Sequence, residues 1–64
     1  MAKTSELLAR LRRAGFVLER HGKRHDLYFQ PQTGKRVVVW RHAKEIPTGT
    51  FYSILRDAGL GDEE

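Results

Sequence analysis

Three short segments of alternating apolar residues follow one another in the middle of the chain, and a segment with helical periodicity lies on each side of them. The alternating segments are 16–21, 24–30 and 35–40. A glycine turn at 22–23 and a turn at 31–34 that contains proline and glycine separate them. Links this short join neighbouring strands as antiparallel hairpins. The pattern therefore predicts a three-stranded antiparallel meander with one helix before it and one after it.

The two helices are bounded by the usual start and stop signals. The first is expected over 5–14, where apolar residues recur at helical spacing, with Thr4 or Ser5 as the N-cap and a glycine immediately after the last turn. The second begins at Pro47, because proline suits the first helical position, and it ends at Gly59. We expect the next residue, Leu60, to fold back against this helix.

Neither helix can bury its apolar stripe unless both pack on one face of the sheet. The predicted fold class is therefore α+β, in the order α-β-β-β-α, with residues 1–64 forming a single domain. The expected core is Leu7, Leu8, Leu11, Phe16, Leu18, Leu27, Phe29, Val37, Val39, Ile54, Leu55 and Ala58. Tyr28, Val38 and Trp40 are then expected on the open face of the sheet, as an apolar strip of the kind that often binds a partner.

Charge and composition narrow the possible functions. Twelve Lys and Arg stand against eight Asp and Glu, and three of those acidic residues are the last three of the chain. The remaining body is strongly basic, which favours a polyanion such as a nucleic acid as partner. A core this small has no room for a large organic cofactor, so we expect none.

Several classes of site and location are excluded or disfavoured. The chain has no cysteine, so it cannot form a disulfide or a thiolate zinc site. It has neither a phosphate-binding P-loop, a dinucleotide fingerprint nor the nucleophile elbow of the hydrolases. No apolar run is long enough to span a bilayer, and the N-terminus lacks the apolar core of a signal peptide. We therefore expect a cytoplasmic protein that does not interact with membranes.

His25 is the strongest candidate for chemistry. It lies between a run of cations and the start of an alternating segment, and histidine is the side chain best suited to exchange protons near neutral pH. Lys23, Arg24 or Arg41 could stabilise negative charge on a phosphodiester bound there. A purely structural histidine that orders the turn is the alternative.

The other candidate residues have more than one reading. His42 either caps the second helix or contacts phosphate, and His21 is expected to be a solvated loop residue. Arg10 and Arg13 lie on the polar face of the first helix, where they are either solvated or in contact with an RNA backbone. The spacing of the three histidines, with no carboxylate to complete the set, does not favour a metal site.

A series of short motifs resembles the HicA toxins, a family also described as YcfA-like. The motifs are residues 15–16, 22–28, 31–35, 41–42, 49–51 and 54–60, and their order and spacing match over about 5–60. The resemblance implies a fold like the double-stranded-RNA-binding domain and a metal-independent endoribonuclease that cleaves mRNA. It also implies that His25 is the catalytic residue and that a HicB-like antitoxin binds the toxin and masks this histidine.

The chain departs from the family pattern at two positions. Arg24 stands where the family often has a small residue, and it adds positive charge beside the histidine. Trp40 stands where the family usually has proline, and its indole could stack on a base. Two other functions remain open on the sequence alone: a non-catalytic RNA-binding module, and a protein-interaction domain that uses the open face of the sheet.

Overall fold

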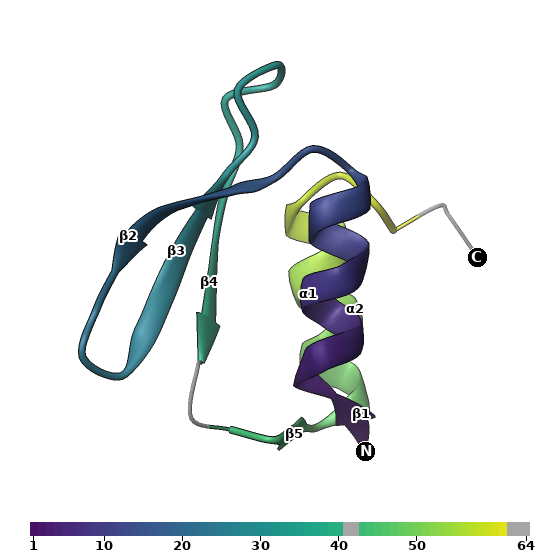
Figure 1. Ribbon diagram of the computed structural model, residues 1–64. Helices are drawn as coiled ribbons and strands as arrows, with labels where there is room; N and C mark the ends of the chain where they lie inside the picture. Colours follow the sequence, from purple (N-terminus) through teal and green to yellow (C-terminus); the bar gives the residue numbers. More distant parts are fainter. Residues whose placement is uncertain (41–42, 62–64) are drawn as a thin grey trace.

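The computed structural model describes residues 1–40 and 43–61, which form two helices and five short strands (Figure 1). In chain order these elements are β1 (Ala2–Lys3), α1 (Thr4–Arg13), β2 (Val17–His21), β3 (His25–Phe29), β4 (Arg36–Trp40), β5 (Glu45–Ile46) and α2 (Thr48–Asp57). The predicted α+β class and the order of the two helices and three main strands are confirmed.

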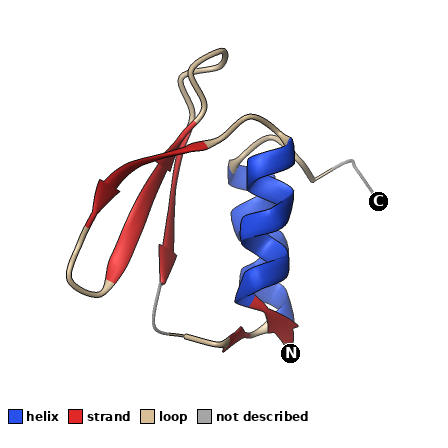
Figure 2. Ribbon diagram, viewed as in Figure 1, coloured by secondary structure: helices blue, strands red, loops and turns tan. Residues whose placement is uncertain are grey.

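The three main strands form an antiparallel sheet in the order β2-β3-β4, and both helices lie on the same side of it (Figure 2). The predicted turn at 31–34 closes the hairpin between β3 and β4. The Gln30 N–H donates to the Lys35 carbonyl at 2.9 Å, and the Gly34 N–H donates to the Gln30 carbonyl at 2.8 Å. Gly34 has φ +77°, a conformation that glycine adopts without a steric penalty.

The sequence did not predict the ribbon that β1 and β5 form below the helices. Ala2 pairs with Ile46 and Lys3 pairs with Glu45. Two-residue strands are too short to show any alternation in the sequence. The ribbon ties the start of the chain to the segment before α2.

The expected N-cap of the first helix is wrong because this ribbon recruits Thr4. The N-cap is Lys3, which makes no side-chain cap hydrogen bond, and Thr4 is already helical and buried. The Thr4 N–H donates to the Lys44 carbonyl at 3.0 Å, and its hydroxyl donates to the Ala43 carbonyl. A long-range partner therefore satisfies the first N–H of the helix, and the hydroxyl that was expected to act as a cap donates to a distant carbonyl instead.

Both helices end as predicted. Gly15 has φ +92°, and the N–H of Phe16 donates to the Leu11 carbonyl at 2.9 Å. At the end of α2, Leu60 folds back and donates its N–H to the Leu55 carbonyl at 2.8 Å. Six-to-one bonds of this kind define the Schellman motif. Pro47 occupies the N-cap of α2, one position earlier than expected.

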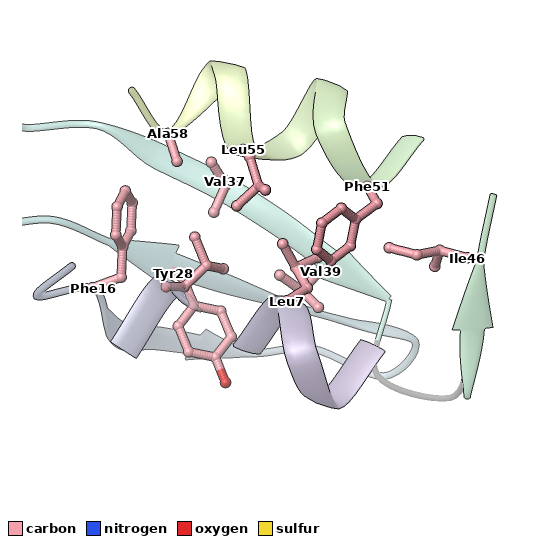
Figure 3. Close-up of a cluster of buried hydrophobic side chains, with 10 residues drawn as sticks. Leu7, Phe16, Tyr28, Val37, Val39, Ile46, Phe51, Leu55 and Ala58 are labelled. Atoms are coloured by element: carbon pink, nitrogen blue, oxygen red, sulfur yellow. The ribbon is translucent and has the colours of Figure 1, made fainter. Parts of the chain in front are cut away.

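The hydrophobic core lies between the helices and one face of the sheet (Figure 3). Its buried apolar residues are Leu7, Leu11, Phe16, Tyr28, Val37, Val39, Ile46, Phe51, Leu55 and Ala58. Leu8 and Ile54, which the sequence placed in the core, are partly buried against it. The β3–β4 register sets Tyr28 opposite Val37 on the covered face.

The face predicted for β3 is wrong, although the face predicted for β4 is right. Tyr28 is only 5% exposed and belongs to the core instead of the open face. Leu27 and Phe29 point the other way and are partly buried, and Leu18 is 50% exposed. Alternation fixes which residues of β3 share a face, but both of its faces carry large apolar side chains.

Pairing with β4 decides the question, because the register sets Tyr28 opposite Val37 on the covered face. That face also carries Asp26 of β3 and Gln30, the residue that follows β3, and both of these polar residues find partners. Gln30 is buried and its side-chain amide donates to the Ala14 carbonyl. Asp26 is buried and lies 3.1 Å from a ring nitrogen of His21. Burial of polar groups is tolerated when they are hydrogen-bonded, so these residues do not exclude this face from the core.

No helix within residues 1–40 and 43–61 is long and apolar enough to cross a membrane.

Candidate functional site: a histidine on the open face of the sheet

His25 is the first residue of β3 and lies directly opposite Trp40 of β4. Its parity within β3 puts the imidazole on the face away from the helices, where it is exposed. The imidazole and indole ring centroids are 5.3 Å apart, and the ring planes are tilted by 59°. The ring is therefore accessible to a ligand from solvent and is held beside an aromatic surface.

A shallow pocket of about 440 Å³ opens beside this histidine. Its lining residues are Arg20, Gly22, His25, Leu27 and Val38. Leu27 and Val38 are cross-strand partners and form an apolar floor, while the arginine supplies positive charge. Among the residues that the structure describes, no acidic side chain lines this pocket.

A β-bulge explains why Arg20 lies in this pocket. The β2–β3 register shifts between Leu18 and Arg20, so that Leu18 pairs with Tyr28 but Arg20 pairs with Leu27. Without the shift, these two even-numbered residues of β2 would share one face. The bulge turns Arg20 to the open face instead, as bulges commonly re-aim a side chain at a site. Sequence alternation carries no signal for it, and this residue was missed.

The turn between β2 and β3 fixes the backbone of His25. The Gly22 N–H donates to the His25 carbonyl at 3.0 Å. A Cβ at position 22 would lie 2.5 Å from that same carbonyl oxygen, which is too close for any side chain. Lys23 and Arg24 are exposed at the tip of this turn, so two further cations lie next to the histidine in the chain.

His21 and Asp26 close the same hairpin from the opposite face. They are register partners, and His21 Nδ1 lies 3.1 Å from Asp26 Oδ1. The carboxylate side chain is 11% exposed and the imidazole is 64% exposed. His21, expected to be a solvated loop residue, is indeed exposed but ends β2 and has this carboxylate as a neighbour.

An ion pair links β2 and β4 across the other half of the open face. Arg36 Nε lies 2.8 Å from Glu19 Oε1, and a second nitrogen lies 3.2 Å from the other carboxylate oxygen. This hydrogen bond lowers the pKa of Glu19 and raises the pKa of Arg36. The Arg36 guanidinium also lies 4.4 Å from the centre of the Phe29 ring, so it covers that aromatic side chain.

The remaining predicted site residues do not all meet at His25. Arg10 and Arg13 lie on α1, where they line a separate hollow of about 350 Å³ with Ala14 and Leu60. The C-terminal end of α1 and the β2–β3 turn lie at opposite ends of the fold (Figure 1). Val38 and Trp40 are 42% and 51% exposed on the open face, as expected.

Two further predictions concern residues outside the part of the chain that the structure describes, namely Arg41 and His42. Within the described part, no three histidine, aspartate or glutamate side chains lie close enough to form a metal site. The described site presents one exposed imidazole among cations. Such an arrangement can bind a phosphate group and transfer a proton at it.

The fold and site together define a small basic α+β domain with an accessible histidine at a cationic hairpin. The family model described as HicA toxin of bacterial toxin-antitoxin matches residues 4–60, and the chain belongs to this family. The protein is thus the toxin of a toxin–antitoxin system, and an antitoxin is its expected partner. A search of curated proteins found no match.

Proposed function

We propose that this toxin is an endoribonuclease that cleaves mRNA in the cytoplasm and uses His25 as its catalytic residue. The observation that carries the proposal is the position of this imidazole, which is exposed on the sheet face at the edge of a pocket that contains Arg20. Family membership supports the proposal, because the resemblance of the motifs implies this activity for the chain.

The reaction that fits the site is attack of a ribose 2′-hydroxyl on the adjacent phosphorus. The new 2′-oxygen–phosphorus bond forms while the bond to the 5′-oxygen breaks, leaving a 2′,3′-cyclic phosphate and a free 5′-hydroxyl. One group must accept the 2′-hydroxyl proton and another must donate a proton to the 5′-oxygen. His25 serves as one of these groups, and proton transfer of this kind contributes about 10²- to 10⁴-fold to the rate.

Positive charge is the second requirement, because the phosphorus gains negative charge in the transition state. Arg20 lines the pocket, and Lys23 and Arg24 lie at the tip of the adjoining turn. We assign Lys23 and Arg24 to the scissile phosphate, together with Arg41 and His42, and Arg20 to a neighbouring phosphate of the same strand. Arg10 and Arg13 form a second basic surface on α1, and we assign them to the RNA backbone away from the cleavage site.

The antitoxin that neutralises this toxin is proposed to be HicB-like and to cover the open face of the sheet. Val38 and Trp40 are the exposed apolar residues next to His25, so a protein bound there would mask the imidazole. Tyr28, which was expected to take part, is buried in the core. Capture of the antitoxin by the toxin, and its loss on Trp40→Ala, tests this assignment.

The experiment that tests the activity compares wild type with His25→Ala on a single-stranded RNA. We expect the cleavage rate to fall by about 10²- to 10⁴-fold, because the proton-transfer group is lost. The same RNA with 2′-O-methyl groups should resist wild type, since it has no free 2′-hydroxyl. Circular dichroism establishes that the variant is folded. Wild-type cleavage by folded His25→Ala would exclude this residue as the catalyst and favour a different active site.

Toxicity in cells provides the matching test in vivo. Induction of the chain should arrest growth and fragment mRNA, and His25→Ala should relieve both effects. If the folded variant still arrests growth while mRNA stays intact, the toxin acts by binding RNA or protein and not by cleavage.

A further inference from the structure

The open face of the sheet, which points away from the helices, has two halves. We call the half that contains Phe29 under Arg36 the covered half, and the half that contains His25 and Trp40 the uncovered half. In the covered half, Arg36 lies 4.4 Å over the ring of Phe29 and is held there by its hydrogen bonds to Glu19. The guanidinium therefore occupies one face of that aromatic ring. The aromatic ring of the covered half is thus already in contact with a side chain of the same protein.

The uncovered half is centred on Trp40. This indole is 51% exposed, and its tilted contact with His25 is the one ring contact it makes within the described residues. Because the two rings are tilted by 59° and not stacked, the indole keeps an aromatic surface for a ligand. Val38, on the same strand and face, is 42% exposed.

Arg20 provides a charge that is not already neutralised. Within residues 1–40 and 43–61 it forms no salt bridge, unlike Arg36 and Arg10, whose partners are Glu19 and Glu6. It lines the pocket whose floor is apolar, and none of the described residues that line that pocket is acidic. An aromatic platform, an apolar floor and an unpaired guanidinium together match a flat base joined to a phosphate.

We propose that the uncovered half is a subsite for one unpaired base of an RNA strand. The base stacks on the indole of Trp40 over the floor of Leu27 and Val38, and Arg20 binds a phosphate that adjoins it. This arrangement places a neighbouring phosphodiester beside His25. The inference deepens the proposed function and rests on it, because it names how the substrate is held at that site.

The same geometry selects single strands over duplexes. In a duplex each base is paired and stacked on its neighbours, so it cannot offer a face to the indole. A single strand offers unpaired bases and requires no base-specific hydrogen bonds for stacking, so every sequence can use the subsite to some extent. Trp40 is therefore a positioning residue for the reaction and not a catalytic one.

The test uses the fact that the chain contains a single tryptophan. Indole fluorescence is measured while wild type is titrated with an oligoribonucleotide whose 2′-positions are all methylated, so that it binds without cleavage. We expect the single strand to quench the fluorescence. The same strand annealed to its complement should need a concentration at least about 10-fold higher to give the same quenching. No quenching at saturation, or equal quenching by the duplex, would overturn the proposal.

Variants then distinguish base stacking on Trp40 from non-specific electrostatic attraction of the RNA. Trp40→Leu should weaken single-strand binding about 5- to 150-fold, as expected for loss of one stacked base. Trp40→Phe should restore most of the affinity, because it restores an aromatic face. Tyr52→Leu is the matched control, since Tyr52 is 43% exposed on α2 and should leave binding unchanged. Equal losses for Trp40→Leu and Tyr52→Leu would contradict a specific subsite.

Cleavage kinetics keep failure of the subsite distinct from failure of the proposed function. Trp40→Leu and Arg20→Gln should raise KM for single-stranded RNA more than they lower kcat. If both variants keep the wild-type KM while His25→Ala is inactive, the endoribonuclease proposal stands and the subsite is wrong. If wild type cleaves nothing but its fluorescence is quenched by single strands, the subsite stands as a binding site and the enzyme proposal is wrong.

Quenching by an antitoxin protein alone, and not by RNA, assigns this half of the face to the protein and overturns the subsite.

Discussion

At the scale of single residues, Gly22 controls the placement of the candidate catalytic histidine. Its N–H holds the His25 carbonyl, and its missing side chain allows the close approach of the two backbones. The neighbouring atom is backbone, so it cannot move aside as the end of a flexible side chain could. Any Cβ at this position must displace the first residue of β3.

We expect Gly22→Ala to lower the free energy of unfolding by about 1–3 kcal/mol and to reduce RNA cleavage beyond the loss of folded protein. Urea unfolding and cleavage at a concentration of denaturant where the variant remains folded measure the two effects. Gly49→Ala is the control, because a Cβ there meets open space in the first turn of α2. It should be neutral or stabilising by up to about 1 kcal/mol. Equal urea midpoints for the two variants would contradict this role for Gly22.

The sequence could propose some of these candidate residues and not others. His25 is a candidate from the sequence alone, because an imidazole among cations is a chemical signal that needs no tertiary structure. Arg20 was missed because its position depends on a β-bulge, which appears only when β2 pairs with β3. The burial of Asp26 beside His21 depends on the same hairpin.

At the scale of elements, the bidentate ion pair between Arg36 and Glu19 links strands that are not neighbours in the sheet. The pair is largely exposed, so its contribution to stability is small, but its pH dependence has a definite sign. The hydrogen bond from Arg36 lowers the pKa of Glu19 from its usual value of 4.5. A carboxylate with a lowered pKa in the folded state stabilises that state above its unfolded pKa. The contribution is lost as the pH falls through the folded value.

We therefore expect Glu19→Gln to be less stable than wild type at neutral pH, with the difference disappearing in acid below the lowered pKa of Glu19. Urea unfolding of both proteins at a series of pH values measures this. A difference of constant size at all pH values would show that Glu19 acts through its shape and not its charge. Glu45→Gln provides a comparison, because Glu45 forms no salt bridge within the described residues.

The elements themselves were well predicted where a local signal marks their ends. The glycines at 15, 34 and 59 all have positive φ and lie where the sequence placed a helix end or a turn. The choice of face in β3 was not predictable in this way. Leu27 and Phe29 are as apolar as Tyr28, so alternation alone allowed either face to be covered.

At the scale of the whole molecule, two of the basic surfaces in the described part of the chain lie apart from each other. One surrounds the β2–β3 turn with Lys23 and Arg24, and the other lies on α1 with Arg10 and Arg13. Both helices lie on one side of the sheet (Figure 2), and the parity of β3 puts His25 on the other face. A single phosphate of a bound RNA therefore cannot contact both His25 and the α1 surface.

We expect the double variant Arg10→Gln/Arg13→Gln to weaken RNA binding and to reduce its salt dependence by about one unit of slope per lost contact, without lowering cleavage at saturating RNA. Lys23→Gln/Arg24→Gln should lower both affinity and the saturated cleavage rate, since these residues adjoin His25. Arg56→Gln serves as the control, because Arg56 is exposed near the end of α2. An unchanged affinity and salt slope for the α1 variant would remove Arg10 and Arg13 from the RNA surface.

The sequence by itself determined the two helices, the three main strands, their order and the chemical character of the candidate site. These predictions rest on local properties: helical and alternating periods, turn glycines and a histidine among cations. Such properties belong to short segments and do not depend on how the rest of the chain folds. Only the tertiary structure decided which face of β3 is covered, that Arg20 reaches the pocket, and that β1 pairs with β5. These outcomes depend on strand register and on partners distant in the sequence, because pairing between strands chooses among arrangements that local patterns leave equally favourable.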